Sequence, residues 1–179
     1  MDAGDLGPQV AEAIDRCRSA RRAGDGPAAR RWAERALEAS GGELPERAQA
    51  LAMLAQVARD EGRLDDARAR YRQALADNPG HRVGMRAYLL RHLGDLEREA
   101  GEASAEPLLE EALALYRELP ANDASLANAI RPLALLRETQ GRMEQARRLW
   151  EEARRRYDAA GIRSGIEECD ARLKRGEVR

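Results

Sequence analysis

Hydrophobic and small residues recur along this chain at spacings of three and four positions, the period of short amphipathic helices. Leu51, Leu54, Ala55 and Ala58 stand at i, i+3, i+4 and i+7, on one side of an α-helix. Gly62 interrupts this pattern, and a glycine just beyond a periodic run is a typical helix stop. The segment therefore predicts a helix that ends at a turn near Gly62.

A second amphipathic pattern follows this turn. Ala67, Tyr71, Ala74 and Leu75 share one helical face, and Asn78-Pro79-Gly80 ends the pattern. Because the turn between the two helices is short, the helices fold back on each other. The stretch therefore predicts an antiparallel helical hairpin.

The hairpin pattern occurs four times. Its turn glycines are Gly24, Gly62, Gly101 and Gly141, at intervals of 38, 39 and 40 residues. Three columns of small residues accompany them: Cys17, Ala55, Gly94 and Ala134; Ala29, Ala67, Ala105 and Ala146; Ala36, Ala74, Ala112 and Ala153. Between the last two columns stand Ala33, Tyr71, Leu109 and Trp150. In the third hairpin the alanine follows its glycine one residue early, which indicates a deletion in the turn. This period predicts a solenoid whose helices approach closely at the small residues.

The pattern resembles the tetratricopeptide repeat, whose signature is a small residue in the first helix, a turn glycine, then alanine, an aromatic residue, alanine and proline. The second hairpin matches best, at Leu51, Leu54, Ala55, Ala58, Gly62, Ala67, Tyr71, Ala74 and Pro79. The resemblance covers about residues 8–160. The period exceeds the usual 34 residues of the family. The resemblance implies an all-α, right-handed α-solenoid, a superhelix of antiparallel helix pairs.

We expect one domain over residues 1–179. Its hairpins are expected at about 8–40, 44–78, 81–118 and 123–160, divided by linkers rich in glycine and proline. After Gly161, an apolar stripe of Ile162, Ile166, Cys169 and Leu173 predicts a capping helix at about 162–174. Pro132 falls inside the first helix of the fourth hairpin, where we expect a kink near Asn128.

Composition excludes some classes of partner. The 31 basic and 32 acidic residues give a net charge of -1, so no global field points to nucleic acid or to an anionic membrane. Apolar runs are short, and the start Met-Asp-Ala-Gly-Asp lacks the pattern of a signal peptide, so we expect a cytoplasmic protein. Cys17 and Cys169 are far apart and are interpreted as buried small residues.

No pattern of catalytic, cofactor-binding or metal-ligating residues emerges. His81 and His92 lack cysteine or histidine partners at ligand spacing and are interpreted as surface or groove residues. The pairs Glu110-Glu111 and Glu151-Glu152 point about 100 degrees apart on a helix, so they are interpreted as solvated faces. We therefore expect a protein that is not an enzyme and needs no cofactor.

The resemblance implies a concave groove lined by the first helix of each pair. The face of these helices turned away from the packed stripe predicts a peptide-binding groove of Arg18, Arg21, Gln49, Gln56, Arg59, Tyr88, Arg91, His92, Asp95, Arg98, Asn128 and Arg131. Guanidinium groups bind carboxylates through paired hydrogen bonds, so the predicted ligand is acidic. The family's carboxylate clamp of lysine and asparagine is not reproduced, because Ile14 and Ala52 are apolar at positions that need a basic residue.

Alternatives stay open for this groove. Lys174 is the sole lysine, so arginine dominates the basic residues everywhere, and Asp60, Asp95 and Glu99 stand near the candidates as possible intrahelical partners. For any single arginine a salt-bridged surface position is the simpler interpretation, whereas for the set binding is favoured. The first hypothesis is a non-enzymatic adaptor, monomeric or weakly self-associating, that binds an acidic or extended peptide of another protein. The others are an RNA or single-stranded nucleic-acid groove and a self-assembly module.

Overall fold

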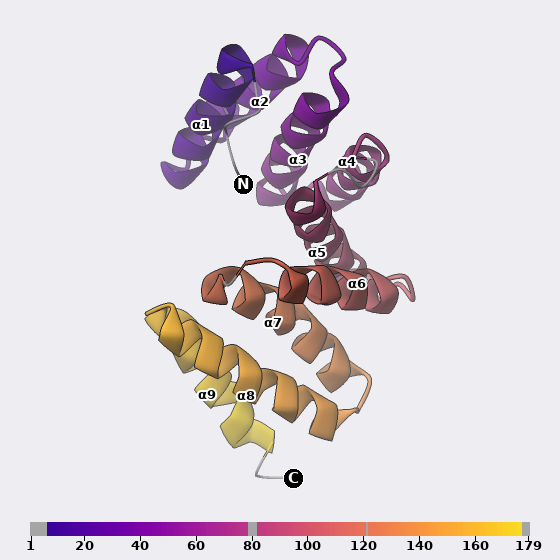
Figure 1. Cartoon of the computed structure of the whole chain (residues 1–179), viewed down its shortest axis with the longest axis vertical. Coiled ribbons are helices and arrows are strands. Elements are labelled where there is room, and N and C mark those ends of the chain that lie inside the picture. Colours follow the sequence, from indigo (N-terminus) through magenta and orange to yellow (C-terminus); the bar gives the residue numbers. More distant parts are fainter. Residues whose placement is uncertain (1–6, 79–81, 121, 177–179) are drawn as a thin grey trace. The chain divides into compact units, whose positions relative to one another are not determined.

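The computed structural model describes residues 7–78, 82–120 and 122–176, and in this part of the chain it contains nine α-helices and no strand (Figure 1). The helices are α1 (Pro8–Arg22), α2 (Gly26–Ala39), α3 (Leu44–Asp60), α4 (Leu64–Ala76), α5 (Val83–Glu99), α6 (Ala105–Glu118), α7 (Asp123–Thr139), α8 (Met143–Ala159) and α9 (Arg163–Gly176). The all-α fold expected from the periodicity is confirmed. The chain divides into two compact units, residues 1–93 and 94–179, with the boundary inside α5.

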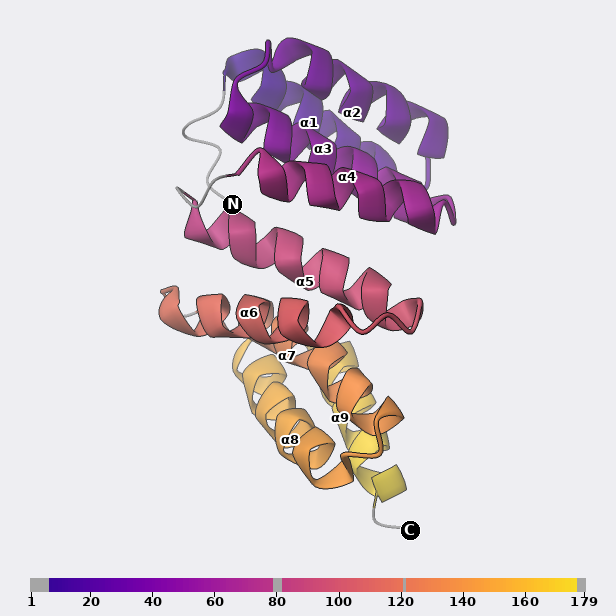
Figure 2. The same ribbon diagram turned by 90° about the vertical axis from the view of Figure 1, so that its right-hand side faces the viewer.

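The first unit is built from helix pairs joined by short turns. Helix α1 packs on α2 and α3 packs on α4, while α3 also contacts both α1 and α2. Figure 2 shows the members of each pair running side by side. The small residues Cys17 and Ala55 are fully buried, as is Tyr71, the larger residue of the second hairpin. The columns found in the sequence therefore mark where these helices meet.

The second unit repeats this arrangement. Helix α7 contacts α6 and α8, and α9 packs on α8, where the sequence predicts a capping helix. Its core contains Leu109, Ile130 and Trp150, each at most 1% exposed, and Cys169, which is a free, fully buried thiol like Cys17. The interpretation of both cysteines as buried small residues is confirmed.

Glycine ends the first helix of each hairpin by adopting a left-handed backbone conformation. The φ angles of Gly24, Gly62, Gly101 and Gly141 are 74°, 75°, 73° and 71°. In each case the next residue donates its N–H to the carbonyl five positions earlier, as Arg63 does to Ala58 at 2.8 Å. This is the Schellman arrangement, which favours glycine because glycine has no Cβ. The backbone conformation therefore explains the glycine period.

The third hairpin accommodates its missing residue at the start of α6. Helix α6 begins at Ala105, four positions after Gly101, whereas α4 and α8 begin two positions after their glycines. Ala105 is nevertheless fully buried, like its counterparts in the other hairpins. The deletion thus removes the first turn of the helix and leaves the packing column intact.

Pro132 lies within α7 and is buried. Helix α7 is assigned as one continuous helix from Asp123 to Thr139. The kink near Asn128 stays a prediction.

Candidate functional site

Five predicted groove residues of the first unit lie around one group of rings. Arg21 comes from α1, Arg59 from α3, and Tyr88, Arg91 and His92 from α5. Together with Tyr71 of α4, they form what we call the aromatic–arginine centre. The sequence predicts Tyr71 as a core residue but does not predict its contact with α5, because that contact joins residues of two different hairpins.

His92 packs between two tyrosines. Its ring stacks on Tyr71 with 5.5 Å between centroids and 2° between planes. Tyr88 meets the same ring at 4.4 Å and 62°, an edge-on contact. Both are favourable aromatic geometries. His92, expected at the surface or in a groove, is therefore packed against rings on two sides.

Arg91 fixes the tautomer of His92. Its Nη2 lies 2.6 Å from Nε2 of His92, and its guanidinium carbon is 5.7 Å from the centre of the Tyr88 ring. A guanidinium can only donate, so Nε2 of the imidazole must accept. The proton of the neutral ring is then assigned to Nδ1.

The surroundings keep the rings neutral. Burial lowers the pKa of His92 well below its usual value, and the charges of Arg91, Arg59 and Arg21 lower it further. Burial also raises the pKa of Tyr71 well above its usual value, with a further contribution from Tyr88. At neutral pH the positive charge of the centre therefore resides on its arginines.

The neutral state of His92 predicts a pH-dependent stability. Because the folded-state pKa lies below the unfolded one, the unfolded chain takes up the proton first as pH falls. Lowering the pH from 7.5 to 5.5 should reduce the free energy of unfolding of the first unit by about 1 kcal/mol. Urea titrations at several pH values measure this change.

Histidine substitutions provide the controls for this effect. His92→Gln should flatten the pH dependence between 5.5 and 7.5, whatever it does to stability at pH 7.5. His81→Gln, which removes the other histidine, should leave the dependence in place. Equal slopes for the wild type and His92→Gln would contradict the assignment.

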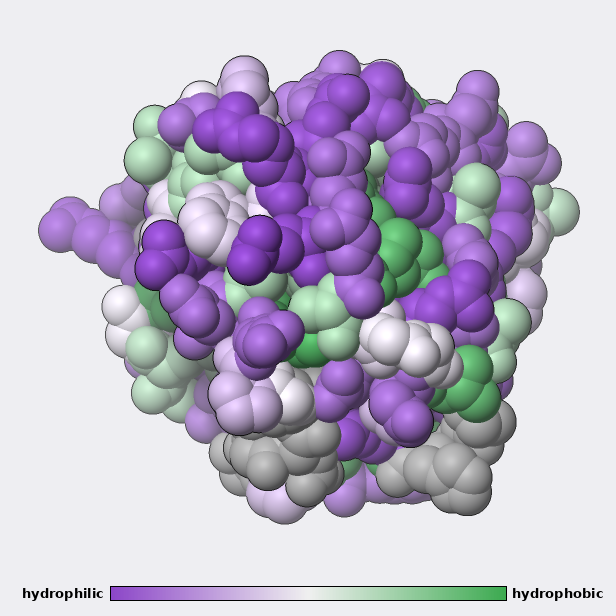
Figure 3. Space-filling model, turned by 90° about the horizontal axis from the view of Figure 1, so that it is seen from above, coloured by the Kyte–Doolittle hydropathy of each residue, from purple (hydrophilic) through white to green (hydrophobic). Residues whose placement is uncertain are grey.

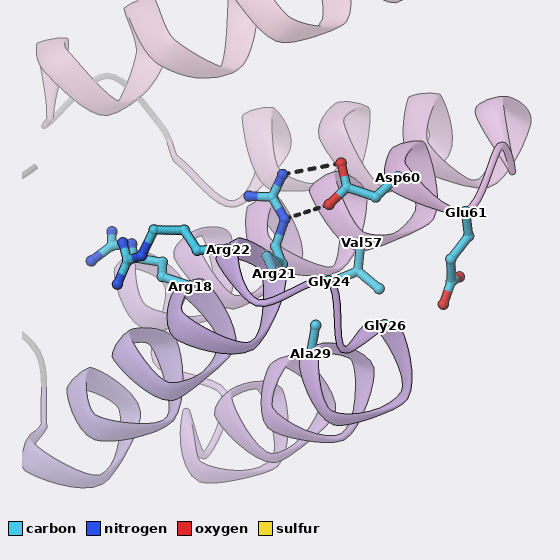
Figure 4. Close-up of a pocket in the computed structure, with 9 residues that line it drawn as sticks. All are labelled: Arg18, Arg21, Arg22, Gly24, Gly26, Ala29, Val57, Asp60 and Glu61. Atoms are coloured by element: carbon cyan, nitrogen blue, oxygen red, sulfur yellow. Dashed lines mark hydrogen bonds and ion pairs between the residues drawn. The ribbon is translucent and has the colours of Figure 1, made fainter.

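A cleft of about 480 Å³ adjoins the centre between α1, α2 and α3. Arg21 and Asp60 point toward each other, with Nε donating to Oδ2 at 2.6 Å and Nη2 to Oδ1 at 3.2 Å (Figure 4). Arg18 and Arg22 point together to one side, and Glu61 lies on the other (Figure 4). Arg21 thus belongs both to the cleft and to the centre.

The other predicted groove residues of the first unit differ in exposure. Arg18 pairs with Asp15 at 3.0 Å, and Gln56 is partly exposed. Gln49 is only 4% exposed, because α3 is covered by α1, α2 and α4. The first helix of a pair therefore has less open surface than the sequence analysis assumes.

In the second unit the predicted groove residues bind each other or neighbouring helices. Asp95 is 8% exposed and accepts from Nη2 of Arg98 at 2.7 Å. Arg131 donates to Glu168 of α9 at 2.7 Å. Asn128 accepts from the hydroxyl of Tyr157 at 2.9 Å. These side chains stabilise the second unit, and we place the candidate site in the first.

A buried arginine in the second unit was missed by the sequence analysis. The Arg137 side chain is 7% exposed and pairs with Glu106 at 2.7 Å and with Glu110. Hydrogen bonds from Gln140, Arg137 and Arg142 lower the pKa of Glu106 to about 2. Glu110, interpreted as solvated, is half-exposed and also serves this ion pair. These charged side chains pair with one another, so we interpret them as a structural ion-pair network.

The architecture is that of an α-solenoid built from antiparallel helix pairs. The family model of the tetratricopeptide repeat matches residues 9–77. Residues 9–77 are therefore similar to the tetratricopeptide repeat, and the later hairpins continue the same pattern of buried small residues. Proteins of this family are generally non-catalytic interaction or scaffold modules. No curated protein matches this sequence.

Solved structures share the fold at low sequence identity. A putative kinesin light chain of Podosopora anserina with nearly identical TPR-like repeats has a TM-score of 0.68 at 19% identity, over 93% of both chains. PilF of Pseudomonas aeruginosa has a TM-score of 0.65 at 20% identity, over 94% of this chain and 76% of its own. MamA from Desulfovibrio magneticus has a TM-score of 0.62 at 13% identity, over 96% and 97%. At these identities the similarity concerns the fold.

Two other kinds of site are absent from the described residues. No helix among residues 7–78, 82–120 and 122–176 is long and apolar enough to span a membrane. The same part of the chain contains no group of three or more histidine, cysteine, aspartate or glutamate side chains placed to hold a metal ion.

Proposed function

We propose that this protein is a non-enzymatic adaptor that binds an acidic, extended segment of another protein at the aromatic–arginine centre of its first unit. The observation that carries the proposal is the contact of Arg91 with the rings of Tyr88 and His92, where the charges of Arg59 and Arg21 also act on His92.

The chemistry of the centre favours an anionic ligand. Guanidinium groups form paired hydrogen bonds with carboxylates and lose less hydration on burial than an ammonium group does. The partly exposed ring of Tyr88 offers flat contact area beside these charges. Carboxylate side chains of an extended peptide match this combination of donors and rings.

The face of the molecule seen from above favours polar recognition. Figure 3 shows a mainly hydrophilic face, on which hydrophobic residues form small, separate patches. A partner that docks by apolar contact alone needs a larger continuous patch. Arg18 and Arg22 line the adjoining cleft and extend the basic surface beyond the centre.

The test is a binding titration with a defined probe. A fluorescein-labelled peptide of alternating glutamate and glycine should bind more tightly than its glutamine counterpart, and the difference should shrink as salt rises. Arg59→Gln combined with Arg91→Gln should weaken binding of the glutamate peptide at least tenfold, because two charged donors are lost. Fluorescence anisotropy measures both effects.

The matched control removes an arginine elsewhere. Arg163 is 91% exposed in its side chain and pairs only within α9 in the described structure, with Glu167, so Arg163→Gln should leave peptide affinity unchanged. Circular dichroism checks that each variant keeps its helices. Equal affinity for the two peptides would overturn the proposal, as would a single-stranded RNA that binds more tightly and displaces the glutamate peptide.

A further inference from the structure

The outer face of α2 carries four exposed charged side chains, Arg31, Glu34, Arg35 and Glu38. They stand at i, i+3, i+4 and i+7, so they share one side of the helix. Ala33, on the opposite side, is fully buried where α2 packs on α1 and α3. Within the described part of the chain, none of the four charged side chains makes an ion pair or a hydrogen bond. The face therefore presents four charges that the first unit leaves uncompensated.

Exposed charges elsewhere in the chain pair within their own helix. On α8, Arg147 pairs with Glu151 at 3.2 Å and Arg148 pairs with Glu144 at 3.3 Å. On the outer face of α2, each charge instead has a like charge four residues away. Like charges at this spacing destabilise an isolated helix. The order of the charges on α2 is thus unfavourable within the helix itself and favours a partner outside it.

We infer that a second copy of this chain binds to the outer face of α2, with the two α2 helices antiparallel about a two-fold axis. Arg31 then lies beside Glu38 of the second copy, and Glu34 lies beside its Arg35. Two-fold symmetry repeats both contacts, so all four charges of each copy face an opposite charge. A parallel pair would place each charge beside its like, so the order of charges selects the antiparallel arrangement.

This inference goes beyond the proposed function, because the outer face of α2 contains no residue of the aromatic–arginine centre. The same face has room for side chains of a second copy. A hollow of about 380 Å³ is lined by the four charged residues and by Trp32. Trp32 is partly buried, and the guanidinium carbon of Arg16 lies 4.6 Å from the centre of its ring. The uncovered part of this ring adds apolar contact area to the ion pairs.

The chemistry of this face predicts a weak dimer. Each exposed ion pair contributes little free energy, and one helix face is a small interface. Sedimentation equilibrium of the full chain in low salt should show an average mass that rises from the monomer toward the dimer as protein concentration increases. The dissociation constant of the dimer should increase about fivefold or more in high salt, because salt screens exposed charges.

Charge reversal tests whether α2 forms the interface. Arg31→Glu with Arg35→Glu makes the outer face wholly acidic, and Glu34→Arg with Glu38→Arg makes it wholly basic. Neither variant alone should dimerise, because like charges then face each other. An equimolar mixture of the two should form a heterodimer, since every contact again joins opposite charges. A variant that carries all four reversals should recover the homodimer of the wild type.

The matched control makes an acidic face on another helix. Arg147→Glu with Arg148→Glu on α8 should dimerise like the wild type and should form no heterodimer with the basic α2 variant. Circular dichroism checks that each variant keeps its helices. A wild type that stays monomeric at every concentration in low salt overturns the inference, as does association that survives both α2 reversals. Neither result bears on the acidic-peptide titration, which tests the proposed function.

Discussion

Replacing Gly94 with leucine should lower the free energy of unfolding of the second unit by about 3 kcal/mol, as overpacking of a tight core does. A Cβ at this position would lie 2.8 Å from Cγ and Cδ2 of Leu109 and 3.2 Å from Cβ of Leu108. Leu109 is fully buried and has little room to move. The larger side chain therefore forces α5 and α6 apart where they cross. A urea denaturation series followed by circular dichroism measures the loss.

Ala114→Leu provides the control for this substitution. Ala114 is exposed on α6, in the same hairpin, and lines an open cleft beside Leu113 and Leu133, so a leucine there adds similar bulk where there is room for it. We expect a change within about 0.5 kcal/mol. If Gly94→Leu were as mild as this control, the two helices could not cross as closely as the structure has them.

Replacing Gly165 with alanine should weaken the packing of α9 on α8 by about 2 kcal/mol. The added Cβ would lie 2.5–2.7 Å from three ring atoms of Tyr157. This ring is 3% exposed, and its hydroxyl donates to Asn128, so it has little freedom to turn aside. The clash outweighs the gain of about 1 kcal/mol in helix propensity that alanine offers over glycine.

Hydrogen exchange of the α9 amides is the sensitive measurement for this prediction. Protection should fall in α9 more than in α6 and α7. Ser164→Ala, at the exposed neighbouring position of the same helix, should leave protection unchanged or raise it slightly. Increased protection in Gly165→Ala would mean that Tyr157 does not cover this part of α9.

The helical scaffold was predictable because its determinants are local and periodic. Glycines such as Gly62 end helices through their own backbone conformation, and alanines such as Ala74 lie where helices must approach closely. Both effects act at each position separately, so they leave a visible period in the sequence. The burial of Tyr71 and Trp150 follows from the same period.

The candidate site was predictable only in part, because several of its contacts join residues of different hairpins. Asp95 does pair with Arg98 within its own helix, as its spacing suggested. Asp60, expected as a partner on its own helix, instead pairs with Arg21 of another hairpin. The contact between Tyr71 and His92 likewise joins two hairpins, and no local pattern specifies it. Identifying such pairs requires the packing of one hairpin on the next.

The turn glycines are needed for their left-handed backbone conformation, not because a side chain would lack room at the turn. A Cβ at Gly24, Gly62, Gly101 or Gly141 would have no atom within 4 Å apart from its own neighbours. The chain beside these turns can therefore gain or lose a residue without a clash, as the late start of α6 illustrates. Hairpins of unequal length can then follow one another with the same spacing between their buried small residues. The length of each turn can therefore vary without any change in the core.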